Sequence, residues 1–95
     1  MRVDEFQRHV EAIYFARDKK RGLDGTFRWF IEEVGELAAA LREDDKANLA
    51  NEFADVLAWL STLASLRGIE LAKAVDKYSG GCPVCRAIPC SCPEK

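Results

Sequence analysis

Long apolar runs, a surplus of one charge and a second histidine are all missing from this 95-residue sequence, and each absence excludes a class of protein. No apolar stretch is long enough to cross a bilayer. Lys and Arg number 14 against 16 Asp and Glu, so the chain lacks the basic face that DNA or RNA binding requires. The single histidine, His9, has no Glu-x-x-His partner, which disfavours a di-iron carboxylate bundle.

Two further absences indicate the compartment. The first residues, 1–6, are charged and lack the basic-then-apolar pattern of a signal peptide. Cysteine is absent up to residue 81, and all four cysteines then fall within 82–92. We therefore expect a cytoplasmic protein, in which such a cluster indicates a metal site before it indicates disulfides.

Apolar residues recur at helical spacing in four segments, and none alternates convincingly at the strand period. The expected helices cover about 4–18, 26–42, 46–67 and 70–78. A basic, flexible turn over 19–25 would separate the first two, with Thr26 as N-cap of the second. Asp44 or Asp45 is the expected cap of the third. The sequence predicts an all-α fold, a four-helix bundle over 1–79 followed by a cysteine-rich tail over 80–95.

The two central helices carry broad apolar surfaces. Seven residues of the second recur at helical spacing and are expected to face the core: Phe27, Phe30, Ile31, Val34, Leu37, Ala38 and Leu41. The third has a large apolar stripe and small residues on its other side: Ala50, Ala54, Ala58 and Ser61. A helix that is apolar or small nearly all round is usually buried on several sides. In a chain this short we expect a second subunit to provide that cover.

Acidic pairs occur on both central helices. Glu33 and Glu36 are three residues apart, as are Glu52 and Asp55, so each pair shares one helical face. If the two helices pack antiparallel, these pairs can face each other, and Glu32 reaches the same region.

Such a cluster suits magnesium, which takes oxygen ligands and keeps some of its waters. Four carboxylates can hold one or two ions, with manganese as the alternative metal, and a fifth can act as general base. Solvated surface acids are the ordinary alternative. The metal interpretation is favoured because like charges at this spacing repel, and because the neighbours include Trp29, Asn48 and Trp59 rather than lysines.

Glu32-Glu33-Val34-Gly35-Glu36, followed after fifteen residues by Glu52-Phe53-Ala54-Asp55, resembles the EExxE…ExxD signature of MazG-type nucleotide pyrophosphohydrolases. The resemblance covers about residues 4–78. It implies a dimer or dimer of dimers that hydrolyses a nucleoside triphosphate to a monophosphate and pyrophosphate. It also implies that Glu33, Glu36, Glu52 and Asp55 are magnesium ligands and that Glu32 is an accessory acid.

Several residues are candidates for contact with the substrate. Lys73 and Lys77 share one helical face and can reach phosphates, as can Lys19, Lys20 and Arg21 in the first turn; for each, a solvated side chain is the alternative. Trp29 and Trp59 flank the acids and can stack on a base, although aromatics at helical spacing are more often core. Asn48 can bind the nucleotide or orient Glu52, or can serve only in local capping.

The tail contains Cys82-Pro83-Val84-Cys85 and Cys90-Ser91-Cys92. Four thiolates suit structural zinc, because zinc takes soft ligands in a tetrahedron. An iron–sulfur cluster also uses four cysteines, and unligated thiols are the third alternative. If the acids are only surface, the rival function is a non-enzymatic helical interaction module with the zinc tail as a docking site.

Overall fold

The computed structural model describes residues 1–94, and these form helices without strands. The elements are α1 (Val3–Glu43), α2 (Lys46–Leu66), α3 (Leu71–Ala74) and the 3₁₀ helix η1 (Val75–Tyr78). The prediction of an all-α protein is confirmed. The expected four helices are matched in part, since the first two are joined as α1 and the fourth is divided between α3 and η1.

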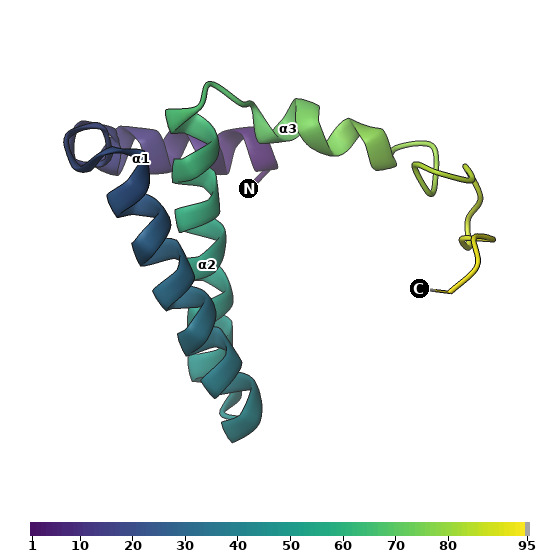
Figure 1. Cartoon of the computed structure of the whole chain (residues 1–95), viewed down its shortest axis with the longest axis horizontal. Helices are drawn as coiled ribbons and strands as arrows, with labels where there is room; N and C mark the ends of the chain where they lie inside the picture. The colour runs from purple at the N-terminus through teal and green to yellow at the C-terminus, as the bar shows by residue number, and fades with distance from the viewer. Residues whose placement is uncertain (95) are drawn as a thin grey trace.

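A bend at Gly22 divides α1 into two halves that run in different directions (Figure 1). Gly22 has φ 85° and ψ 173°, a conformation that only glycine adopts without strain. The flexible turn expected over 19–25 is wrong, because the other residues of this segment are helical. Thr26 is not an N-cap. It is fully buried inside α1, where its hydroxyl accepts a hydrogen bond from Arg21 Nη1 at 3.2 Å.

The second half of α1 and α2 lie side by side as an antiparallel hairpin (Figure 1). Asp44 ends α1 in the left-handed conformation (φ 55°), and its amide donates to the carbonyl of Ala40. Asp45 begins α2, because its carboxylate accepts the backbone amide of Asn48 at 3.3 Å. The predicted cap is confirmed, and the tight connection fixes which residues of the two helices face each other.

The first half of α1 crosses the C-terminal end of α2 (Figure 1) and is held there by polar side chains. Gln7 is 1% exposed. Its Nε2 donates to Ser65 Oγ at 3.1 Å and to the Ile69 carbonyl at 2.8 Å, while its Oε1 accepts the Leu71 amide at 2.8 Å. Ser65 in turn donates to Glu11 at 2.6 Å. These bonds fix α1, α2 and the start of α3 relative to one another.

The apolar core of the single chain is thin. Among residues 1–94 only Val10 and Ala40 are buried hydrophobic side chains. Much of the face expected to point to the core is exposed instead, including Phe27 (51%), Ile31 (50%) and Leu41 (55%). The physical reason is that each helix of a two-helix hairpin has one neighbour, so an apolar surface wider than that contact stays uncovered.

The chain beyond α2 leads away from the hairpin (Figure 1). α3 and η1 form a short arm, and the cysteine-rich segment follows as irregular structure up to residue 94. Lys95, the last residue of the tail predicted over 80–95, lies outside the described residues. Over residues 1–94, no helix is both long and apolar enough to span a membrane.

Candidate active site

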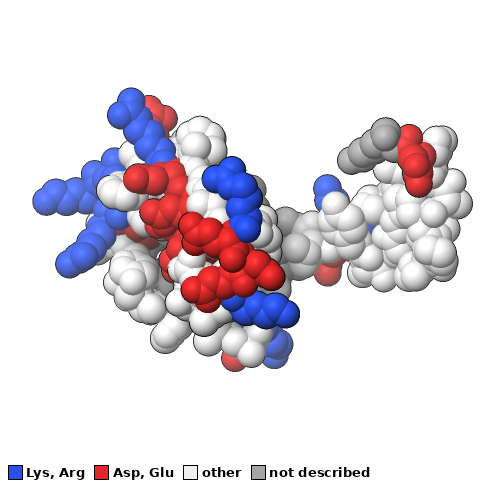
Figure 2. All heavy atoms as spheres, turned by 90° about the horizontal axis from the view of Figure 1, so that it is seen from below, with Lys and Arg blue, Asp and Glu red and all other residues white. Residues whose placement is uncertain are grey.

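Three carboxylates converge where the second half of α1 faces α2. Oxygen atoms of Glu33, Glu36 and Glu52 all lie within 4.8 Å of one another. Glu33 and Glu36 are adjacent because they are one helical turn apart, and the antiparallel hairpin brings Glu52 to them from α2. Figure 2 shows acidic side chains gathered on one face of the helical part of the molecule, with lysines and arginines around them.

The cluster is electrostatically strained. Burial raises the pKa of Glu33 to about 7, and its interaction with Glu36 and the charges of Asp55 and Glu52 add to this effect. Partial burial also raises the pKa of Glu52, followed by repulsion from Glu36 and Asp55. Like charges this close oppose ionisation of one another.

Two oxygens of the cluster suit a cation. Glu33 Oε2 and Glu52 Oε2 are buried, and neither has a hydrogen-bond partner within residues 1–94. An unpartnered buried carboxylate oxygen is costly, so such atoms mark a place for a positive ligand. All the donors are hard carboxylate oxygens, the type that magnesium and manganese prefer. The residues present therefore fit a divalent metal ion.

The other two acids of the motif lie apart from this group of three. Asp55 is close enough for its charge to raise the pKa of both Glu33 and Glu52, but it also lines a cavity next to the cluster. Glu32 is exposed and is not one of the three converging carboxylates. Asp55 thus connects the acidic cluster to the neighbouring cavity.

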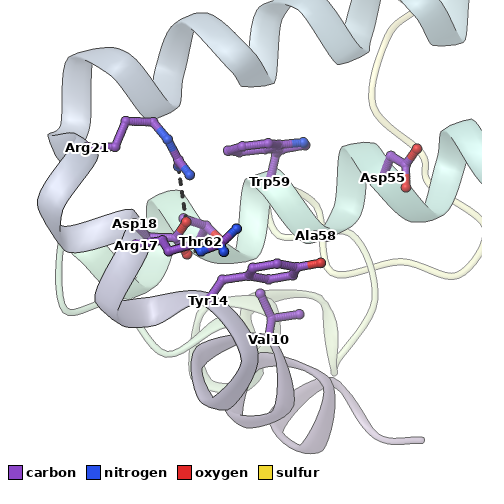
Figure 3. Close-up of a pocket in the computed structure, with 9 residues that line it drawn as sticks. All are labelled: Val10, Tyr14, Arg17, Asp18, Arg21, Asp55, Ala58, Trp59 and Thr62. Carbon is purple, nitrogen blue, oxygen red and sulfur yellow. Dashed lines mark hydrogen bonds and ion pairs between the residues drawn. The ribbon is translucent and has the colours of Figure 1, made fainter.

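That cavity has a volume of about 310 Å³ and lies between the first half of α1 and α2 (Figure 3). Its lining includes residues of both helices: Val10, Tyr14, Arg17, Asp18, Arg21, Asp55, Ala58, Trp59 and Thr62. Trp59 stands one helical turn beyond Asp55. It stacks on Trp29 with ring centroids 6.2 Å apart and planes at 14°, and the Arg21 guanidinium lies 4.9 Å from its ring centroid.

A buried acid that was not identified from the sequence organises this cavity. Asp18 is 3% exposed and accepts from Arg21 Nη1 at 3.0 Å (the dashed line in Figure 3) and from Thr62 Oγ1 at 3.1 Å. Asp18 was expected only as the last residue of the first helix. Arg21 lies one helical turn from Asp18, whereas the contact with Thr62 depends on the bend at Gly22, which lets the first half of α1 cross α2. Tyr14 and Arg17 were missed for the same reason.

Some of the residues predicted to contact the substrate lie at the cavity and others do not. Trp29 and Trp59 lie together beside the cavity, but Lys73 and Lys77 do not line it. Lys73 is paired with Glu70 at 2.8 Å, and Lys77 Nζ lies 5.2 Å from the ring centroid of Tyr78. Asn48 donates its backbone amide to Asp45, a bond in which the Asn48 side chain takes no part. Of the basic residues in the predicted first turn, Arg21 lines the cavity and Lys19 and Lys20 do not.

The four cysteines form a second cluster in the tail. All four sulfur atoms lie within 4.8 Å of one another, and none is in a disulfide. Hydrogen bonds from Ser91 and from the Ala87 backbone lower the pKa of the Cys85 thiol to about 5, whereas the three neighbouring thiols raise that of Cys92 to about 11. Four soft donors at one point can hold a metal ion.

The helical hairpin with carboxylates across its interface is a site of the kind that could hold a divalent metal ion. A family model for the MazG nucleotide pyrophosphohydrolase domain matches residues 21–84. The chain belongs to this family, as the acidic motif predicted, and the family's activity on nucleotides disfavours the rival interaction module. No match was found among the curated proteins. The matched range includes all five acids and ends before Cys85, so three of the four cysteines lie beyond it.

Proposed function

We propose that this chain hydrolyses a nucleoside triphosphate to a monophosphate and pyrophosphate at the acidic cluster, with magnesium as cofactor. The observation that carries the proposal is the pair of unpartnered buried oxygens, Glu33 Oε2 and Glu52 Oε2, between the two helices that the family model matches. A bound cation would offset the cost of burying these oxygens without a partner.

Glu33, Glu36 and Glu52 would hold the metal, with Asp55 as the fourth ligand on the side of the cavity. Bound magnesium neutralises phosphate charge and lowers the pKa of a coordinated water. As a ligand Glu33 would have to be ionised, and its pKa of about 7 in the free protein means that metal binding would release part of a proton at neutral pH. Glu32, exposed beside the ligands, is proposed as the accessory acid that accepts a proton from the attacking water.

The cavity is the proposed site of the base and sugar. Its volume of about 310 Å³ lies at the lower end of ligand pockets, which suits a nucleoside rather than a whole triphosphate. Trp59 and Tyr14 provide aromatic surface for the base. Asp55 lines this cavity and lies near Glu33 and Glu52, so a metal ion held by these acids would attract the phosphates to the edge of the cavity. Arg17, which lines the same cavity, provides positive charge, whereas the charge of Arg21 is paired with Asp18.

The active unit is proposed to be a homodimer or a dimer of dimers. Phe27, Ile31 and Leu41 on α1 and Phe53 on α2 are each about half exposed, on the two helices that carry the acids. Burying apolar surface is worth about 25 cal/mol per Å². A second copy that covers these side chains would therefore stabilise the hairpin in which the ligands are held.

A screen of nucleoside triphosphates, with pyrophosphate as the readout, tests the function. Turnover should require magnesium or manganese and should fall at least about 100-fold in Glu36→Gln and in Asp55→Asn. Circular dichroism should show unchanged helix content in both variants. Asp24→Asn, an exposed acid of α1 outside the cluster, is the control. Failure to release pyrophosphate from any nucleoside triphosphate, or full activity in both ligand variants, would refute the assignment.

A further inference from the structure

We propose that the tail holds one structural zinc ion, bound by Cys82, Cys85, Cys90 and Cys92. The site goes beyond the hydrolytic function and does not depend on it. Cys85, Cys90 and Cys92 also lie past the end of the family match at residue 84, so the family match does not account for the site.

The distances between sulfur atoms carry the inference. A regular tetrahedron with Zn–S bonds of about 2.3 Å has edges of about 3.8 Å. Cys82 Sγ lies 3.8 Å from Cys92 Sγ, and Cys85 Sγ lies 3.8 Å from Cys90 Sγ. These two pairs have no residue in common and therefore correspond to opposite edges of one tetrahedron. A disulfide would need about 2.05 Å.

The spacing also decides against larger metal centres. The four sulfur atoms all lie within 4.8 Å of one another. An iron–sulfur cluster places several iron and sulfide atoms between its cysteines and needs more room than that. One ion fits, and four thiolates around it fill a tetrahedron, so no position is open for water and the zinc is structural rather than catalytic.

The backbone around the cysteines is arranged to hold thiolates. Arg86 adopts the left-handed conformation (φ 67°) after Cys85, and its amide donates to the Cys82 carbonyl at 2.7 Å, which closes the Cys-x-x-Cys turn. Amides point at sulfur as well: Ser91 N lies 3.3 Å from Cys85 Sγ, and Cys92 N lies 3.3 Å from Cys90 Sγ. These donors offset part of the charge of a tetrathiolate site.

Gly81 shows how closely the two parts of the loop approach. A Cβ at this position would lie 2.7 Å from the Arg86 carbonyl oxygen and 3.1 Å from that of Ala87, and φ is 110°. Only glycine fits there. The segment has little else to stabilise it, because Val84 and Ile88 are 84% and 82% exposed. Without an apolar core, metal binding is the available source of folding free energy.

Elemental analysis of the full chain, purified under reducing and chelator-free conditions, should give about one zinc per chain. Cys85→Ser and Cys90→Ser should lose that zinc, whereas Val84→Ser, a neighbouring change that touches no ligand, should keep it. Circular dichroism should show the helices intact in all three. Cobalt added to the metal-free wild-type chain should give the intense visible bands of a tetrahedral tetrathiolate. This measurement tests the site even if a cysteine variant fails to fold.

Three results would overturn the proposal. One is a wild-type chain without zinc whose metal-free form gives no tetrathiolate cobalt spectrum. The second is full zinc content in both cysteine variants. The third is iron in place of zinc, visible as colour in the purified protein. Because each measurement reports metal rather than turnover, an inactive hydrolase would not affect the outcome.

Discussion

Replacing Glu36 by glutamine should make the metal-free protein more stable and the magnesium-loaded protein less stable. Glu36 contributes to the raised pKa of both Glu33 and Glu52. Its carboxylate therefore works against folding when no cation is present. The same carboxylate should bind magnesium, so its removal has opposite consequences in the two states.

The size of each effect can be bracketed. Two unit charges about 4 Å apart repel by about 1 kcal/mol in water and about 4 kcal/mol in the medium near a protein surface. Glu36 is exposed, so a gain near the lower value is expected in chelator. For a domain of this size 1 kcal/mol corresponds to a Tm increase of about 4–8 °C. Magnesium at 100 times its Kd should stabilise the wild type by about 2.7 kcal/mol, and the variant should lose most of that.

Thermal unfolding in EDTA and in magnesium, at one protein concentration, measures both effects. The expected result is a reversal, with the variant melting higher in EDTA and the wild type melting higher in magnesium. Asp24→Asn should change Tm little in either buffer and not reverse the order. A Glu36→Gln variant that melts below the wild type in EDTA would show that the acids do not repel one another in the free protein. The same magnesium shift in both proteins would show that Glu36 is not a ligand.

Four more results are expected. The folded-state pKa of Glu33, about 7, exceeds its ordinary value of 4.5, so the stability of the metal-free protein should fall as pH rises through 7. For the same reason, thermal unfolding at two pH values should show a larger magnesium-induced increase in Tm at pH 8 than at pH 5.5. Trp59→Ala should raise KM about 5- to 150-fold in steady-state assays, because base stacking is worth about 1–3 kcal/mol. An unchanged KM would show that the base does not stack on Trp59 in the cavity. Sedimentation should show at least a dimer, and a fully active monomer would contradict the proposed assembly. Truncation after Ser79 should remove zinc in elemental analysis and retain much of the hydrolysis; complete inactivity would place the tail in the active site.

The sequence predicted those parts of the molecule that depend on local spacing. Acids three residues apart share a helical face whatever the tertiary structure, and the short turn at Asp44 and Asp45 makes the two helices antiparallel. Together these two facts are enough to predict that Glu33, Glu36 and Glu52 lie within reach of one another, as they do. The cysteine cluster followed in the same way, since its ligands lie within eleven residues of chain.

The parts that were missed depend on contacts between distant segments. Gly22 was expected within a loop, but a single residue at positive φ suffices to turn the helix, and its neighbours remain helical. The bend places Asp18 and Arg21 over α2, where Thr62 completes the buried pair. No pattern within residues 18–26 shows that a residue 44 positions away will meet Asp18. The exposed face of α1 that carries Phe27, Ile31 and Leu41 was misassigned to the core because periodicity shows that a face is apolar and does not show which surface covers it.

Both clusters in this chain are arranged so that like groups are held together by the fold rather than by attraction between them. In the acidic cluster the antiparallel hairpin holds the carboxylates close together, so the proposed site would be formed before any metal ion binds. In the tail no comparable framework exists: the sulfur atoms are collected by one short loop with exposed apolar side chains. A preformed site of the first kind can release and rebind its ion during turnover without unfolding. A site of the second kind depends on its ion for its own structure. This difference is the physical reason to expect magnesium exchange at the hairpin and a permanently bound zinc in the tail.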